Sequence, residues 1–305
     1  MIQKLIVAVF VLALAAVSAM GQTPTLRIVS EDPNLPADLF YGNVKVKPLR
    51  LRPGTNVPIT IDDTDFFVNQ NYVDFLNRFP DPGGFDYWVG SFGFCGSNQA
   101  CISDRRVRVS AAFFIEQEFQ DTGSFIYRLY QGSLGRHPTY AEFMPDRREV
   151  IGGASLEAKK AAFAEVWVQR AAFKTLYPDS LTHAQFVDAV LLTMKNGDGV
   201  DLSSQRNTYI AAYDGGATRG QVVRQIIDNA TFANTEYNPS FVLMQYFGYL
   251  RRDAEPDGYN FWLNVVNNRE VNNYLGMVCA FVTSAEFQLR FGSSVTHTNA
   301  ECGHY

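Results

Sequence analysis

The sequence is poor in residues that metal and nucleophilic chemistry use, with only four histidines and four cysteines among 305 residues. It contains no His-Glu-x-x-His zinc motif, no Gly-x-Ser-x-Gly nucleophile motif and no glycine-rich phosphate loop. None of the histidines is expected to have a nucleophile or a carboxylate at helical spacing. Glu116 and Glu118 are two apart, so on a helix they would point to different sides and could not serve one bond as acid and base. We therefore expect no catalytic residue and no cofactor.

Long hydrophobic runs are also scarce. The longest extends from Leu5 to Val17, follows Lys4, and is succeeded by small residues. It is shorter than the roughly 20 apolar residues that a membrane-spanning helix requires, but its length and flanks are typical of a signal peptide. We predict a signal peptide over 1–21, cleaved after Ala19 or Gly21. The mature chain is then exported (periplasmic, cell-surface or secreted) and has no membrane span.

Positive charge is not in excess either. The 26 Lys and Arg residues are outnumbered by 31 Asp and Glu residues, for a net charge of -5 at pH 7. Nucleic-acid-binding surfaces are usually basic, so we expect no nucleic-acid partner. In contrast, 24 Phe and 15 Tyr residues within a 47% hydrophobic composition are ample for a packed core.

What the sequence does contain is an internal repeat, because the segment 67–88 can be laid on 241–262 without a gap. The coinciding positions are Phe67/Phe241, Val68/Val242, Tyr72/Tyr246, Leu76/Leu250, Arg78/Arg252, Pro82/Pro256, Gly84/Gly258 and Trp88/Trp262. Average residue usage predicts about one or two chance matches over this length. Two copies indicate an array of repeats.

Weaker copies lie between these two. One keeps Phe125, Tyr130, Leu134 and Arg136 but loses the following Gly and Trp, and another begins at Phe186. We place the closing phenylalanines of the four copies at Phe113, Phe173, Phe232 and Phe287. The pattern predicts four units of roughly 55 to 60 residues. Units one and two occupy 63–178, units three and four occupy 179–292, and a tail covers 293–305.

Within a unit, the apolar residues follow a period near 3.6, which predicts helices. Pro82 and Pro256 each open a second helix after a break. We place Arg78 and Arg252 in the last turn of the first helix, where a cation favours the negative dipole end. A glycine one turn into the second helix, Gly84 or Gly258, lets that helix lie close to the preceding Tyr. The predicted fold is all-α, a multi-helix array of four degenerate quasi-repeats after a short extended segment.

The run Tyr-x3-Leu-x-Arg, then Pro-Asp-x-x-Gly-x-x-Trp, then Ser-Ala-x-Phe resembles the secreted bacterial domain of unknown function numbered 4214. The stretch FVLMQYFGYLRR is similar to acidobacterial members, and the resemblance extends from about Asp65 to Gly292. It implies an all-helical, exported, often surface-associated module with distant similarity to phycobilisome linker domains. It implies no activity and carries over no catalytic residue. The second copy departs from the motif, with Thr139 and Glu142 in place of Asp and Gly.

The stretch 22–62 has a different, proline-rich composition. Alternation at 44–47 and 49–52, on either side of Pro48, predicts two short extended pieces, and Leu26 to Val29 could pair with one of them. Lys45, Lys47, Arg50 and Arg52 would form a basic ribbon able to grip an acidic polymer. A solvated strand face is the favoured interpretation.

The four cysteines are an even number in an exported chain, which favours disulfides. Cys95 and Cys101 bracket a short polar loop and are predicted to pair. Cys279 then pairs with Cys302 by default. A zinc site made by His297, Cys302 and His304 is the disfavoured alternative, because the ligands are few and lie on a terminal segment.

Two further features have ligand interpretations. The segment 196–201 resembles a calcium loop, but Met194 and Gln205 would occupy positions that need carboxylates, so we predict a turn. The three tryptophans, Trp88, Trp167 and Trp262, could stack on sugars, and we favour a core position for all three.

The leading functional hypothesis is an exported non-enzymatic structural or interaction module of the cell envelope or extracellular space, which binds an unknown protein or glycan partner. The alternative is a secreted helical glycan hydrolase whose two carboxylates come from different repeat units. The hydrolase requires a carboxylic acid buried beside Trp or Tyr in a cleft. The interaction module predicts solvated carboxylates and aromatic residues in the core.

Overall fold

The computed structural model describes residues 26–29, 38–41, 44–46 and 59–305. The chain divides into two compact units, Met1–Pro48 and Leu49–Tyr305. The predicted signal peptide, the extended piece at 49–52 and the side chains of the basic ribbon lie outside the described residues.

In the first compact unit, Met1–Pro48, three short strands form an antiparallel sheet in the order β1 (Leu26–Val29), β2 (Asp38–Tyr41) and β3 (Val44–Val46). Leu26 lies opposite Tyr41, and Tyr41 in turn lies opposite Val44. The predicted pairing of Leu26–Val29 with the piece at 44–47 is therefore wrong, since β2 lies between them, and a pairing with the piece at 49–52 lies outside the described residues. The intervening strand β2 was missed, because its four residues show too little alternation to separate a strand from a loop.

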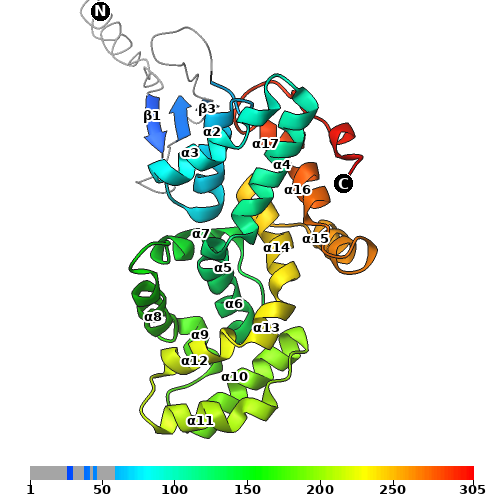
Figure 1. Cartoon of the computed structure of the whole chain (residues 1–305). Helices are drawn as coiled ribbons and strands as arrows, with labels where there is room; N and C mark the ends of the chain where they lie inside the picture. The colour runs from blue at the N-terminus through cyan, green and yellow to red at the C-terminus, as the bar shows by residue number, and fades with distance from the viewer. Residues whose placement is uncertain (1–25, 30–37, 42–43, 47–58) are drawn as a thin grey trace, which may run out of the picture. The chain divides into compact units, whose positions relative to one another are not determined.

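The second compact unit, Leu49–Tyr305, is built from helices, as predicted. It contains the four repeat units, each of which has a first, a second, a third and a fourth helix in the same order (Figure 1). The first helices are α2 (Thr64–Asn71) with its π-helical extension η1 (Tyr72–Leu76), α6 (Gly123–Leu134), α10 (His183–Asp198), and α14 (Tyr237–Gln245) with the π-helical η4 (Tyr246–Leu250). The second helices are α3 (Pro82–Gly90), α7 (Tyr140–Glu149), α11 (Arg206–Asp214) after the 3₁₀ turn η3 (Ser203–Gln205), and α15 (Pro256–Asn264) with the π-helical η5 (Val265–Arg269).

The third helices are α4 (Gln99–Ile115), which follows the 3₁₀ turn η2 (Gly93–Cys95), then α8 (Leu156–Trp167), α12 (Arg219–Ile227) and α16 (Tyr274–Val282). The fourth helices are short: α5 (Gln117–Asp121), α9 (Ala171–Leu176), α13 (Ala230–Thr235) and α17 (Ala285–Gln288). A last 3₁₀ turn, η6 (Asn299–Cys302), lies in the tail. The array is not open at its ends, because α16 of unit four packs against α4 of unit one.

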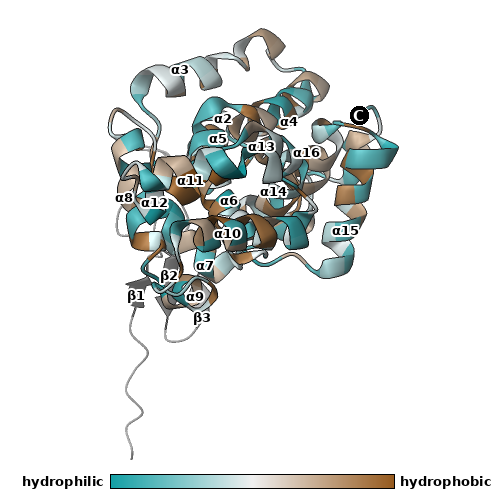
Figure 2. Ribbon diagram, turned by 90° about the horizontal axis from the view of Figure 1, so that it is seen from below, coloured by the Kyte–Doolittle hydropathy of each residue, from teal (hydrophilic) through white to brown (hydrophobic). Residues whose placement is uncertain are grey.

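Local chemistry explains many of the helix starts. Thr139, Thr182 and Thr218 each form a capping box at the start of α7, α10 and α12. Asp81 caps α3 by accepting the Gly84 amide at 2.8 Å, and Pro82 follows it at the first helical position. Figure 2 shows hydrophilic and hydrophobic residues mixed along most helices, as burial of one face requires.

The opening phenylalanines of the four units are fully buried, and each lies in a first helix: Phe67, Phe125, Phe186 and Phe241. The closing residue of unit one was placed wrongly. Residues 116, 170, 229 and 284 are the N-caps of the four short helices, and a buried Phe follows three positions later at Phe119, Phe173, Phe232 and Phe287. Phe113 instead lies in α4. The gapless register breaks between Trp88 and Phe113, because α4 has 17 residues whereas its counterpart α16 has 9.

Two disulfides are present, Cys95–Cys101 and Cys279–Cys302, with Cα separations of 5.5 and 5.8 Å. The zinc alternative is therefore wrong, since the Cys302 sulfur is bonded to Cys279. Among the described residues, no group of three His, Cys, Asp or Glu side chains is placed to hold a metal ion.

The predicted turn at 196–201 is also partly wrong. Helix α10 continues through Asp198, and its C-cap is Gly199 in the left-handed conformation at φ 73°. The chain turns only after this glycine, and Asp201 then accepts the Ser203 amide at 2.9 Å. No helix in the described part of the chain is long and apolar enough to cross a membrane.

Candidate functional site: a repeated aromatic and arginine site

The Tyr and Arg of the repeat motif form a cation–π contact in three of the four units. The guanidinium carbon lies 4.9 Å from the ring centroid for Arg78 over Tyr72, and 5.5 Å for both Arg136 over Tyr130 and Arg252 over Tyr246. A left-handed residue just before each arginine turns the chain back over the helix: Asn77, Gly135 and Arg251. The arginines thus lie beyond the first helix, and their expected place in its last turn is wrong.

Each arginine also binds a carboxylate. Arg78 donates to Glu118 at 2.6 and 2.7 Å, and Arg252 donates to Glu286 at 2.6 and 3.0 Å. Both acids lie on the fourth helix of their own unit, one residue before the closing Phe. These hydrogen bonds raise the pKa of Arg78 and of Arg252. The arginine therefore ties the end of the first helix to the fourth.

The motif glycines have the close contact that the sequence predicted. A Cβ built on Gly84 would overlap the Tyr72 hydroxyl, and one on Gly258 would lie 2.5 Å from the Tyr246 hydroxyl. Any side chain at these positions would push the second helix away from the tyrosine. Glycine thereby sets the distance between the first two helices of units one and four.

Beside each glycine, the second helix carries two adjacent aromatic residues, which we call the aromatic dyads: Tyr87–Trp88 in unit one and Phe261–Trp262 in unit four. Their ring centroids are 5.0 and 5.2 Å apart and their planes meet at 75° and 76°. The first member of each dyad is exposed, at 68% for Tyr87 and 51% for Phe261. Two units thus display the same edge-to-face pair on their surface.

The tryptophans of the dyads are only partly buried. The buried side of each indole packs on a phenylalanine of the third helix. The centroid distances are 5.6 Å for Trp88 to Phe113 and 6.0 Å for Trp262 to Phe281. The predicted core position holds fully for Trp167, which is 1% exposed, and only in part for the other two.

In unit one, a pocket of about 310 Å³ lies beside the dyad. It is lined by Tyr72, Leu76, Arg78, Tyr87, Trp88, Phe113, Glu116, Gln117 and Glu118. Four of the predicted motif residues, Tyr72, Leu76, Arg78 and Trp88, thereby meet the residues 116–118 that lie far from them in sequence.

Unit two has a pocket of similar size, about 320 Å³, but different chemistry. At the position of Trp88 it carries Asp146, which accepts hydrogen bonds from Tyr130 at 2.7 Å and from Arg170 at 2.6 Å on both oxygens. Glu142 stands at the glycine position, and the hydrogen bonds of Arg136 lower its pKa to about 2. Ion pairs replace the exposed rings in this unit.

Two neighbouring acids at the junction of the repeat units, the buried Glu236 and the half-buried Asp198, were missed by the sequence reasoning. Glu236, 3% exposed, accepts the Tyr127 hydroxyl at 2.9 Å. Burial, together with the charge of Asp198, raises the pKa of Glu236 to about 7. Burial also raises the pKa of Asp198 to about 6, against a hydrogen bond from Gln131. No local motif signals this pair, because Asp198 ends α10 whereas Glu236 lies between α13 and α14.

A second buried acid, Asp74 in η1, binds arginines from unit four. Arg290 donates to both of its oxygens at 3.0 and 2.9 Å, and Arg251 donates at 3.1 Å. Burial opposes ionisation, but the two guanidinium charges hold the pKa of Asp74 below its usual value. The Asp74 network fastens unit one to unit four.

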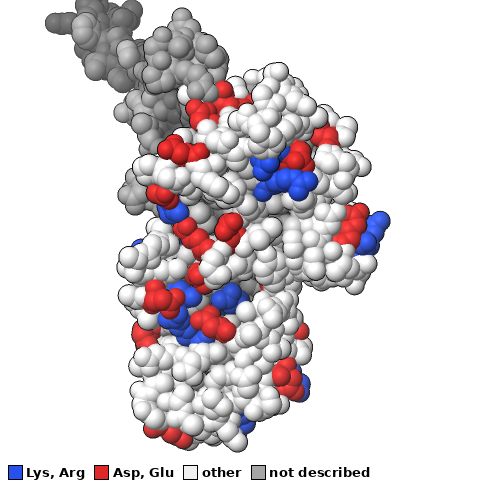
Figure 3. Space-filling model, in the orientation of Figure 1, with Lys and Arg blue, Asp and Glu red and all other residues white. Residues whose placement is uncertain are grey.

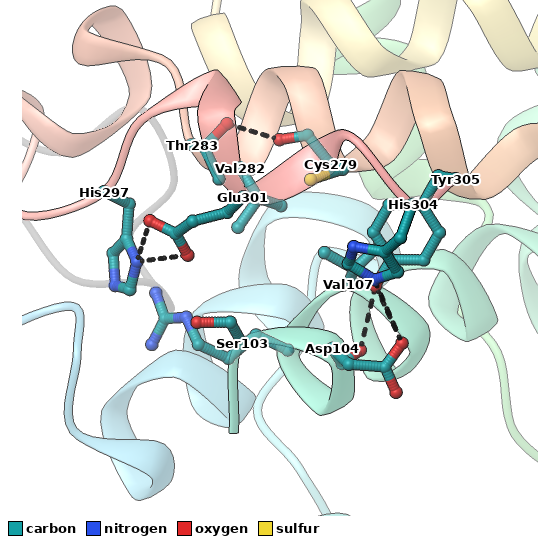
Figure 4. A pocket seen from close by; sticks show the side chains of 11 residues that line it. Ser103, Asp104, Val107, Cys279, Val282, Thr283, His297, Glu301, His304 and Tyr305 are labelled. Atoms are coloured by element: carbon teal, nitrogen blue, oxygen red, sulfur yellow. Dashed lines mark hydrogen bonds and ion pairs between the residues drawn. The ribbon is translucent and has the colours of Figure 1, made fainter. Parts of the chain in front are cut away.

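The C-terminal tail is held against the start of the helical unit (Figure 4). His297 lies 3.0 Å from both oxygens of Glu301 and, through its other ring nitrogen, 3.0 Å from Asp62. The hydrogen bond with Asp62 raises the pKa of His297. The expectation that no histidine has a carboxylate at helical spacing is wrong here, since Glu301 is four residues on. Tyr305 adds a 2.9 Å hydrogen bond to Asp104.

The charges on the face drawn in Figure 3 lie in small groups of both signs rather than in one patch. This mixing agrees with the arginine and carboxylate pairs described above. It offers no extended basic stripe on that face to a nucleic acid.

Residues 223–291 match the family model Domain of unknown function (DUF4214). This segment contains the motif copy of unit four, with Tyr246, Arg252, Gly258 and Trp262. No curated protein and no solved structure matches the chain. The closer likeness to acidobacterial members and the distant one to phycobilisome linker domains stay predictions. With the motif, its geometry and the model in agreement, the chain carries a domain of the DUF4214 family at residues 223–291.

Proposed function

We propose that the chain is an exported, non-enzymatic interaction module of the cell envelope or extracellular space, and that its aromatic dyads contact a protein or glycan partner. The observation that carries this proposal is the pair of exposed dyads at the same position of two units. Their exposure differs from the expectation that the aromatic residues of such a module lie in the core. Neither Tyr87 nor Phe261 is needed to fill the core, and exposed aromatic groups are typical of binding surfaces.

Export is supported by the disulfides. Cys95–Cys101 and Cys279–Cys302 use every cysteine of the chain, and such bonds persist in oxidising compartments. The signal peptide predicted over 1–21 agrees with this.

The lack of catalysis is supported by the state of three of the four carboxylates that line the two pockets. The oxygens of Glu118 and Asp146 already accept hydrogen bonds from Arg78 and Arg170, so they are not available to a substrate. Glu142, with a pKa of about 2, holds no proton at neutral pH to donate to a leaving group.

The alternative of a glycan hydrolase is favoured by one observation, the buried Glu236 beside Tyr127 with a pKa of about 7. A raised pKa suits a general acid. However, Glu236 lines neither of the two pockets described above, and a substrate would have to open the junction of the units to reach it.

The test incubates the purified mature chain with envelope fractions and with purified polysaccharides, and follows both retention and the release of reducing ends. Retention without release supports the interaction module. Turnover that Glu236→Gln abolishes makes the protein a hydrolase, and the absence of retention on every fraction refutes the binding role.

A further inference from the structure

We infer that the aromatic dyad of unit one and its adjacent pocket form a subsite for one ring of a neutral saccharide, and that the dyad of unit four is a weaker subsite of the same kind. This inference rests on the proposed binding function and adds the chemical class of the partner. It assigns the stacking role to Tyr87 and Phe261.

The geometry favours a ligand ring that packs one face against Tyr87. Trp88 is held between Tyr87 and Phe113, and the two dyad rings stand at 75° to each other. A saccharide ring that lies on the exposed face of Tyr87 is therefore bordered by a second, fixed aromatic edge. Because the Trp88 contact limits the motion of Tyr87, little side-chain entropy is lost on binding.

The rim of the pocket supplies polar groups suited to hydroxyls. Glu116 and Gln117 are exposed beside the dyad. A carboxylate accepts hydrogen bonds from sugar hydroxyls, and an amide both donates and accepts them. A pocket near 300 Å³ is at the small end of ligand sites, as expected for one ring of a longer chain.

The charges disfavour an acidic ligand. The N–H groups of Arg78 donate hydrogen bonds to Glu118, to the Phe79 carbonyl at 3.1 Å and to Asp81 at 3.5 Å. The remaining charged group of the lining is Glu116, which repels a polyanion. Uronic, sulfated or phosphorylated polymers therefore find no cationic partner here.

The comparison with unit four separates a saccharide from a cationic peptide. Ser284 and Ala285 stand there at the N-cap and first helical positions that Glu116 and Gln117 occupy in unit one. The feature that the two dyads share is ring geometry, whereas the additional acid is confined to unit one. A ligand that binds both dyads is recognised through ring faces. Unit four is the weaker subsite, because Ser284 and Ala285 offer fewer hydrogen-bonding groups than Glu116 and Gln117. Two copies of one contact suit a polymer that itself repeats.

The test titrates the mature chain with cellohexaose, maltohexaose and chitohexaose, and follows tryptophan fluorescence and heat. Hexagalacturonate and octalysine are the acidic and cationic arms. We expect at least one neutral hexasaccharide to bind. Tyr87→Ala should then weaken binding about tenfold, the effect expected of one aromatic anchor, and Phe261→Ala should weaken it less.

Three controls accompany the titration. Tyr87→Phe keeps the stacking ring and should retain most of the affinity. Leu192→Ala removes another exposed apolar side chain, 57% exposed and outside both pockets, and should bind as the wild type does. Far-ultraviolet circular dichroism checks that each variant unfolds at the wild-type temperature.

The inference is overturned if no neutral hexasaccharide binds, if only hexagalacturonate or octalysine binds, or if Tyr87→Ala leaves the affinity unchanged. Retention of the double variant Tyr87→Ala/Phe261→Ala on envelope fractions at the wild-type level would refute the dyads as contacts and leave only the binding role of the chain standing. Failure of the wild type itself to be retained would refute the proposed function.

Discussion

The buried carboxyl of Glu236 makes the stability of the helical unit depend on pH. In the folded state its pKa is about 7, whereas the ordinary value is 4.5. Between these two values the folded state holds a proton that the unfolded state has lost. The stabilisation is therefore complete below about pH 4.5 and is lost as the pH rises through about 7.

The size of this effect follows from the shift. A difference of roughly 2.5 pKa units corresponds to about 3 kcal/mol of unfolding free energy. Asp198, with a pKa raised to about 6, acts in the same direction, but it is only partly buried and contributes less. His137, which lies against Tyr259, has a pKa lowered by burial and acts in the opposite direction, destabilising the fold as the pH falls.

The perturbation that isolates Glu236 is Glu236→Gln, because the amide oxygen can still accept the Tyr127 hydroxyl. Urea unfolding with the disulfides intact, followed by circular dichroism, gives the free energy of unfolding at pH 5 and pH 8. We expect the wild type to lose about 2 to 3 kcal/mol more than the variant between these values, while His137 contributes equally to both. Equal losses in the two proteins would refute the assignment of the proton to Glu236.

Further predictions concern the interior. Asp74→Asn removes the charge that Arg290 and Arg251 face in a buried site, and should cost about 3 to 5 kcal/mol in urea unfolding; a loss below about 1 kcal/mol would contradict the role of the Asp74 network. Gly258→Ala should cost about 1 to 3 kcal/mol through overlap with the Tyr246 hydroxyl, and much less in a Tyr246→Phe background; equal costs in both would exclude the overlap. Trp167→Ala should cost about 3 to 5 kcal/mol as a fully buried side chain, and the half-buried Trp88→Ala clearly less, so the reverse order would contradict the burial difference. Mass spectrometry of a non-reduced digest of exported protein should show the Cys95–Cys101 and Cys279–Cys302 links, and free thiols would argue against both.

Much of the helical unit follows from local sequence. Apolar periodicity, the threonine capping boxes and the prolines at helix starts each act within a few residues, so the pattern of the chain is enough to place helices such as α3 and α12. The repeat copies also predicted the approach of Gly84 to Tyr72, because both lie in one motif of fixed spacing.

The tertiary structure decided what depends on distant partners. The acid that binds Arg78 proved to be Glu118 because the longer helix α4 shifts the register, which a gapless comparison cannot detect. Nor does the sequence of α7 show that Asp146, which stands at the motif position of the tryptophan, binds Arg170. Burial and long-range pairing arise only when helices pack, and a pKa such as that of Glu236 depends on both. The exposure of Tyr87 and Phe261 has the same origin, since a motif fixes the spacing of two rings but not which of them the neighbouring helices leave uncovered.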